Sequence, residues 1–116
     1  MASHPSGIPH LDVDETHRRE RAGDITLIDV RMAQEWQDTG LPQGSHRATL
    51  QDPQFLSLVH EAVKGDRDRA IAFTCAVGGR SLQAAVIAHQ NGYENVFNVD
   101  GGFAAWHAAA LPTDEA

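Results

Sequence analysis

The sequence predicts an α/β domain built around a mainly parallel sheet. Short apolar runs alternate along the chain with longer segments of helical periodicity. Glycine and proline residues separate these segments, as expected where helices end and the chain turns. One apolar run, residues 70–73, leads directly into a glycine-bearing loop and a further helical segment. Strands and helices that alternate in this way form a parallel sheet covered by the helices.

The length and composition fit one ordinary domain. The chain has 116 residues, of which 41% are hydrophobic and 22% are charged. That length leaves no room for a second core, and the composition lies far from that of disordered chains. We expect one domain over residues 8–112, with short, loose tails over residues 1–7 and 113–116.

The charge and the cysteine content exclude several classes of function. A formal net charge of -7 repels phosphate backbones and anionic lipid, and no stretch approaches the length of a membrane span. The lone cysteine, Cys75, cannot form an internal disulfide, and the seven histidines show no close metal-ligand pattern. We therefore expect a cytoplasmic protein with no nucleic-acid or membrane partner, no metal and no organic cofactor.

The first half of the chain contains signals for helices, a buried strand and a weak strand. Asp12 and Glu15 have the spacing of a capping box, which predicts a short polar helix from that point. Pro53 suits the first turn of a helix whose apolar residues recur at helical spacing until Gly65. The elements expected here are helices at 12–21, 32–37 and 53–65, a buried strand at 26–30 and a weak strand at 48–50.

The second half shows stronger signals. The run at residues 70–73 is apolar throughout, as in a strand buried on both faces. The helical segment before Asn91 and Gly92 is apolar nearly all round, which predicts a buried helix. The elements expected here are strands at 70–73 and 95–99 and helices at 81–90 and 103–110. We expect the aromatic residues Trp36, Phe103 and Trp106 to lie in the core.

The segment that carries chemistry begins at Cys75, between a buried strand and a helix. Sites in open α/β sheets form beyond the carboxyl ends of the strands, where this loop must lie. The thiol faces the positive end of the following helix, and the loop N–H groups can turn inward as an anion nest. Gly78 and Gly79 can take positive φ, so the chain can curl round one atom. All of these effects favour the thiolate, the nucleophilic form of cysteine, and would equally hold a persulfide anion.

Arg80 supports the same interpretation. A cation near a helix N-terminus faces the unfavourable end of the helix dipole, and a bound anion would reverse that effect. We interpret Cys75 and Arg80 as two sides of an anion pocket. The alternative is that Cys75 is a small buried hydrophobe, which is the commoner role of a lone cysteine at a strand end, and that the glycines only form a turn.

Three separated motifs resemble the rhodanese family, in order and over residues 8–112. The first is Leu27-Ile28-Asp29-Val30-Arg31, followed by Glu35-Trp36. The second is the active-site loop, Cys75-Ala76-Val77-Gly78-Gly79-Arg80-Ser81. The third is Gly92-Tyr93-Glu94-Asn95-Val96, followed by Asp100-Gly101-Gly102-Phe103 and Trp106.

The resemblance implies a rhodanese fold, with a central, mainly parallel five-stranded sheet flanked by helices on both faces. It also implies sulfane-sulfur transfer through a persulfide on Cys75, with the loop residues Ala76, Val77, Gly78, Gly79 and Arg80 binding the substrate. Related cysteine-dependent phosphatases place five residues between cysteine and arginine, whereas four lie between Cys75 and Arg80. This shorter loop makes a phosphatase or an arsenate reductase the less favoured alternative.

Two hypotheses about function follow. The first is a thiosulfate sulfurtransferase that moves sulfur from thiosulfate or a similar donor to cyanide or a thiol, so that its partners are small molecules. The second is a persulfide carrier in a protein sulfur relay, which steady-state turnover would distinguish from a single burst of sulfur loading.

Asp29 and Arg31 stay outside the catalytic set. The spacing of Arg31 and Glu35 predicts an i,i+4 ion pair, and Asp29 is expected to bind the backbone or Arg31.

Overall fold

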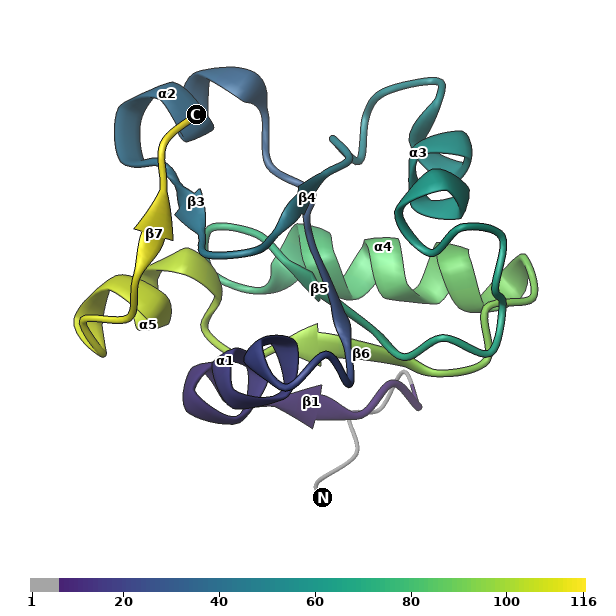
Figure 1. Ribbon diagram of the computed structural model, residues 1–116. Helices are drawn as coiled ribbons and strands as arrows, with labels where there is room; N and C mark the ends of the chain where they lie inside the picture. The colour runs from purple at the N-terminus through teal and green to yellow at the C-terminus, as the bar shows by residue number, and fades with distance from the viewer. Residues whose placement is uncertain (1–6) are drawn as a thin grey trace.

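The computed structural model describes residues 7–116, and these residues form an α/β fold with a five-stranded parallel sheet (Figure 1). The strand order is β1-β6-β5-β2-β4, with every neighbouring pair parallel. The predicted fold class and the predicted five-stranded sheet are confirmed. Residues 1–6 of the expected N-terminal tail lie outside the described residues.

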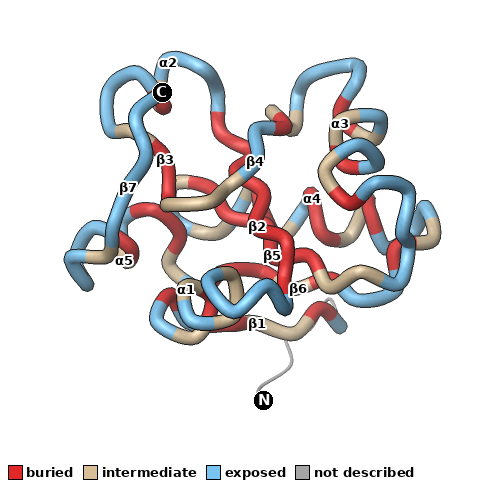
Figure 2. The backbone as a smooth tube through the Cα atoms, in the orientation of Figure 1, coloured by how far each residue is buried: buried red, intermediate tan, exposed pale blue. Residues whose placement is uncertain are grey.

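The central strands are β2 (Thr26–Asp29), β5 (Ile71–Thr74) and β6 (Val96–Val99), and they are the most buried part of the molecule (Figure 2). Their side chains alternate between two cores, because successive residues of a strand point to opposite faces. Ile71 and Phe73 contribute to one core, whereas Ala72 contributes to the other. The prediction that this run is a strand buried on both faces is confirmed.

Helices cover both faces of the sheet. The core on one face includes side chains of α3 (Phe55–Ala62) and α4 (Gly79–Gln90), and the core on the other includes side chains of α1 (Val13–Arg21) and α5 (Gly102–Ala108). Trp36, Phe103 and Trp106 are buried, as predicted. None of the helices in this part of the chain combines the length and the apolar character that crossing a membrane requires.

Helix α1 begins at the predicted residue but without the full capping box. The Asp12 carboxylate accepts a hydrogen bond from the Glu15 N–H at 2.7 Å, which satisfies one unpaired donor of the first turn. The Glu15 carboxylate bonds instead to Arg18 and Arg19 on the next turn. Two guanidinium groups therefore replace the backbone donor that a capping box supplies.

The weak strand expected at residues 48–50 is wrong in position. The structure has β4 at His46–Arg47, on the exposed edge of the sheet beside β2. The Ala48 and Leu50 N–H groups still donate to the carbonyls of Asp29 and Val30, each at 3.0 Å. Beyond Asp29 the partner strand ends, so this pairing continues only as isolated hydrogen bonds.

The expectation of a loose C-terminal tail is also wrong. Strand β7 (Thr113–Asp114) pairs antiparallel with β3 (Leu41–Pro42), which follows α2 (Ala33–Thr39). The Trp106 indole N–H donates to the Pro112 carbonyl at 2.8 Å, and the Gly44 N–H donates to the Asp114 carboxylate at 2.8 Å. Long-range hydrogen bonds therefore fix a segment whose polar composition suggested no order.

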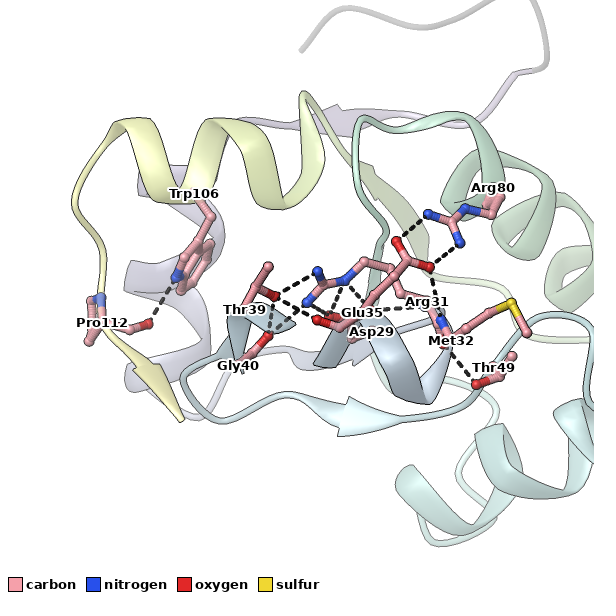
Figure 3. Close-up of polar contacts among 10 residues, drawn as sticks. All are labelled: Asp29, Arg31, Met32, Glu35, Thr39, Gly40, Thr49, Arg80, Trp106 and Pro112. Atoms are coloured by element: carbon pink, nitrogen blue, oxygen red, sulfur yellow. Dashed lines mark hydrogen bonds and ion pairs between the residues drawn. The ribbon is translucent and has the colours of Figure 1, made fainter. Parts of the chain in front are cut away.

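A buried ion pair joins the end of β2 to the end of α2 (Figure 3). Asp29 is fully buried and Arg31 is 2% exposed, and the guanidinium donates to both Asp29 carboxylate oxygens at 2.9–3.2 Å. Arg31 also donates to the Thr39 hydroxyl and the Gly40 carbonyl, and it lies 4.4 Å from the Phe103 ring. The predicted pairing of Asp29 with Arg31 is confirmed, whereas the predicted pairing of Arg31 with Glu35 is wrong.

Removal of the Asp29 carboxylate should destabilise the fold strongly. Asp29→Ala leaves a buried guanidinium without a counter-charge, a change that costs about 3–5 kcal/mol in proteins. We expect the free energy of unfolding in urea to fall by about that amount. Asp24→Ala, at an exposed position, is the control and should change it by less than about 0.5 kcal/mol. A loss at Asp29 no larger than at Asp24 would contradict the importance given to this pair.

Candidate active site

The loop that follows β5 lies at the carboxyl edge of the sheet. β5 ends at Thr74, Cys75 comes next, and α4 begins at Gly79. The ends of the two neighbouring strands, β2 and β6, lie beside it because all three run parallel. The predicted order of strand, loop and helix is therefore present, and the loop occupies the position where α/β sheets form sites.

The Cys75 thiol lies inside the loop and receives hydrogen bonds from it. Cys75 is 1% exposed, and its Sγ accepts a hydrogen bond from the Gly78 N–H at 3.1 Å and from the Ser81 hydroxyl at 3.3 Å. Burial raises the pKa of the Cys75 thiol. The Ser81 hydroxyl and the N–H groups of Ser81, Gly78 and Val77 together outweigh burial, so the pKa lies below its ordinary value. The site therefore favours the thiolate.

Helix α5 determines the path of the loop. The Phe103 N–H donates to the Cys75 carbonyl at 2.7 Å, and the Ala104 N–H donates to the Ala76 carbonyl at 3.0 Å. In a trans peptide the N–H points opposite to the carbonyl, so binding these two carbonyls turns the next N–H groups away from α5. A free N-terminal turn of α5 thus orients the backbone donors of the loop.

Gly102 permits this close approach. A Cβ on Gly102 would lie 2.5 Å from the Cys75 carbonyl oxygen and 2.8 Å from the Ala76 carbonyl carbon. Gly102 also has φ +56°, and Gly78 in the loop itself has φ +112°. The predicted positive φ is found at Gly78 and not at Gly79, which starts α4.

The hydroxyl of Ser81 connects Cys75 to the neighbouring strand. Its oxygen lies 2.6 Å from Oδ1 of Asn98 on β6, and Ser81 and Asn98 are both buried. A hydroxyl has one proton, so it can donate to Cys75 or to Asn98 but not to both at once. The direction of the Ser81 hydrogen bond is therefore coupled to the protonation state of the thiol.

Arg80 points to a carboxylate on another helix (Figure 3). Its guanidinium binds both oxygens of Glu35 on α2, at 2.6 and 2.8 Å. Arg80 lowers the pKa of Glu35 to about 2, so the pair is ionised throughout the neutral range. Glu35 also accepts a hydrogen bond from the Met32 N–H at 3.2 Å. The ion pair thus fastens the start of α4 to the start of α2, whereas substrate binding by Arg80 stays a prediction.

A shallow groove begins beside the loop. Its first part, about 290 Å³, is bordered by Ala76 and Val77 of the loop and by Phe103 and Ala104 of α5. Thr39 and Asp38 of α2 form its other wall. A second part, about 430 Å³, continues along the same two helices to His107.

Of the predicted loop residues, Gly78 donates its N–H to the thiol, whereas Arg80 is directed to Glu35, and substrate binding by the loop stays a prediction. The structure adds residues that sequence reasoning missed. In the sequence, Ser81 stands out only as the end of the second motif, and no pattern gives Asn98 or Gly102 a role in the site. A hydroxyl directly after the Cys75–Arg80 loop could have suggested Ser81. Asn98 lies on a different strand, and no local pattern connects it to Cys75.

Together the fold and the loop define a class of α/β proteins with a buried cysteine at the carboxyl edge of a parallel sheet, in a loop that donates backbone N–H groups to its sulfur. Within this class, the family model of the rhodanese-like domain matches residues 12–109, and the chain belongs to that family.

Similar proteins cover nearly the whole chain. Thiosulfate sulfurtransferase GlpE of Vibrio cholerae is 30% identical over 90% of this chain and 93% of that protein. The solution structure of the rhodanese-like domain of the Anabaena protein Alr3790 is 28% identical, with a TM-score of 0.76 over 93% of this chain and 80% of that chain. A Rhodopseudomonas palustris protein of unknown function, described as a possible tyrosine phosphatase, is 28% identical, with a TM-score of 0.78 over 94% and 86% of the two chains.

The Ser81 hydroxyl should lower the pKa of Cys75. Ser81→Ala removes one hydrogen bond to the thiolate without changing the burial of Cys75, so the pKa should rise. Ultraviolet absorbance of the thiolate during a pH titration reports on Cys75, the one cysteine of the chain, once the same titration of Cys75→Ser has been subtracted to remove the contribution of Tyr93. Ser57→Ala, at an exposed serine of α3, is the control. An unchanged titration midpoint in Ser81→Ala would show that the backbone donors suffice.

Gly102→Ala should disturb the loop. The added methyl group overlaps backbone atoms of Cys75 and Ala76, which cannot move aside as a flexible side chain would. We expect the thiolate titration of Cys75 to shift toward its ordinary pKa, because the N–H groups no longer converge on Sγ. Gly23→Ala, also at positive φ but in open space, controls for backbone strain alone. Equal behaviour of the two variants would argue against the packing role of Gly102.

Proposed function

We propose that this protein is a sulfurtransferase that carries a sulfane sulfur as a persulfide on Cys75. The observation that carries the proposal is the convergence of a side-chain hydroxyl and backbone N–H groups on one buried sulfur atom. The similarity to thiosulfate sulfurtransferase GlpE supports the same chemistry.

The reaction has two halves. The Cys75 thiolate attacks the outer sulfur of thiosulfate or another sulfane donor; a sulfur–sulfur bond forms at Sγ, and sulfite leaves with the electrons of the broken bond. A thiolate or cyanide then attacks the outer sulfur of the persulfide and restores the Cys75 thiolate. Sulfur enters and leaves as a neutral atom in both steps, so no external oxidant or reductant is needed.

The loop supplies the electrostatic stabilisation. The outer sulfur of the persulfide carries the negative charge, and we assign its binding to the backbone N–H groups from Ala76 to Gly79. The N–H groups of Ala76 and Val77 are already oriented by α5 and that of Gly78 already donates to Sγ, so they need little reorganisation when the charge moves outward by one atom. The Ser81 hydroxyl assists at Sγ itself.

The geometry is less suited to phosphate transfer. The Gly78 N–H donates directly to Sγ and Cys75 is 1% exposed, so the loop closes round a single atom. Arg80, the residue that would complete a phosphate ring, is bound by Glu35 through both terminal nitrogens. Release of phosphate from an aryl phosphate, absent in Cys75→Ser, would favour a phosphatase instead.

Incubation with a sulfane donor should load one sulfur atom on the protein. Intact-mass measurement after exposure to thiosulfate or benzenethiosulfonate should show a gain of one sulfur, which cyanide then removes. Cys75→Ser should show no gain, because the hydroxyl at neutral pH is a poor nucleophile. A wild-type mass that no sulfane donor changes would refute the persulfide mechanism.

A further inference from the structure

The burial of Cys75 restricts what part of a donor can enter the loop. Because the residue is 1% exposed and the Gly78 nitrogen lies 3.1 Å from Sγ, the loop leaves little room for any part of a donor beyond the sulfane sulfur. The rest of the donor must lie outside the loop, against the residues that line the adjoining groove. We call these residues the rim: Arg31, Glu35, Asp38, Thr39, Ala76, Val77, Phe103 and Ala104. The chemistry of that rim therefore selects the donor.

The rim offers no uncompensated positive charge. Arg80 is paired with Glu35, and Arg31 is paired with Asp29 (Figure 3). Asp38 adds a further carboxylate, whose hydrogen bond comes from the neutral Gln34 side chain, and no ion pair within residues 7–116 includes it. Each of the two arginines near the groove thus has a carboxylate partner, and Asp38, which lines the groove, adds a carboxylate without a cation partner in that part of the chain. A dianion such as thiosulfate meets net repulsion outside the nest.

The rim is apolar where it touches the loop. Val77 is 73% exposed, and it and Met32 are the two large hydrophobic side chains that residues 7–116 leave exposed. Val77 borders the groove together with Phe103 and Ala104. Contact between the exposed Val77 side chain and an apolar group removes apolar surface from water, which is favourable, whereas the valine cannot donate a hydrogen bond to a sulfonate oxygen.

We propose that the donor is an organic sulfane-sulfur compound with at most one negative charge and an apolar group next to its sulfane sulfur, and that this group binds in the groove between Val77 and Ala104. This inference rests on the proposed sulfurtransferase function. For a thiosulfonate the Cys75 thiolate attacks the sulfane sulfur, a sulfur–sulfur bond forms at Sγ, and the sulfinate leaves with the electrons of the broken bond. Charge and atoms balance without a further reactant.

Benzenethiosulfonate and thiosulfate test the proposal as a matched pair. Both present a sulfane sulfur on a sulfonyl centre, but a phenyl group in one replaces the second anionic oxygen of the other. We expect kcat/KM, with cyanide as acceptor, to be at least about tenfold higher for benzenethiosulfonate, the difference that one charge-assisted contact makes. Added salt should narrow the difference, because it screens the repulsion of the dianion.

Substitutions distinguish the effect of the rim on donor preference from the difference in intrinsic reactivity between the two donors. Val77→Lys places a cation on the exposed loop, and Glu35→Gln leaves the charge of Arg80 uncompensated. Each should reduce the preference for benzenethiosulfonate by about tenfold, chiefly by improving thiosulfate use. Val77→Leu keeps the apolar surface and should retain the preference.

A second pair of variants tests the groove. Ala104→Gln fills it with a polar side chain and should lower the benzenethiosulfonate-to-thiosulfate ratio, whereas Ala108→Gln, exposed on the same helix outside the groove lining, should not.

The outcomes distinguish this inference from the function on which it rests. If thiosulfate is used as well as benzenethiosulfonate, and Val77→Lys leaves the ratio unchanged, the donor class is wrong while the persulfide chemistry stands. If neither donor loads sulfur on Cys75, the proposed function fails, and the donor class fails with it.

Discussion

Two hydrogen bonds from the first turn of α5 to the carbonyls of Cys75 and Ala76 determine the shape of this site. They orient two peptide planes of the loop so that the N–H groups of Ala76 and Val77 point away from α5, and the Gly78 N–H that follows donates to the thiol. They require α5 to approach the loop backbone, which is feasible because Gly102 has no Cβ. The third sequence motif of the chain thus acts on the second: it supplies the donors that hold the nucleophile loop in place.

The thiol itself reflects a balance between burial and hydrogen bonding. Burial alone would keep Cys75 protonated and inert, as in most buried cysteines. The Ser81 hydroxyl and the backbone donors reverse this, so the nucleophile is both shielded from water and ionised more readily than an ordinary thiol. In the proposed mechanism, the same shielding would protect the Cys75 persulfide from solvent between donor and acceptor.

The two ion pairs near the loop connect separate elements of the fold. Arg31 connects the end of β2 to the end of α2, and Arg80 connects the start of α4 to the start of α2. Both pairs hold elements that border the groove in place. In each pair the carboxylate compensates the positive charge of the arginine. In the proposed function, anion binding then depends on backbone dipoles, which act over short distances.

The sequence alone determined the fold class, the order of the central elements and the position of the cysteine loop. These follow from local signals: apolar runs, helical spacing and glycine before a helix. It did not determine the partner of Arg80. The spacing of Arg31 and Glu35 suggested a pair within one helix, but Arg31 lies before the start of α2, and only the tertiary structure brings Glu35 to Arg80 on α4. Tertiary structure likewise decided three other contacts: the hydrogen bond between Ser81 and Asn98, the pairing of β3 with β7, and the approach of Gly102 to the loop. Each joins residues whose local sequence patterns carry no information about one another.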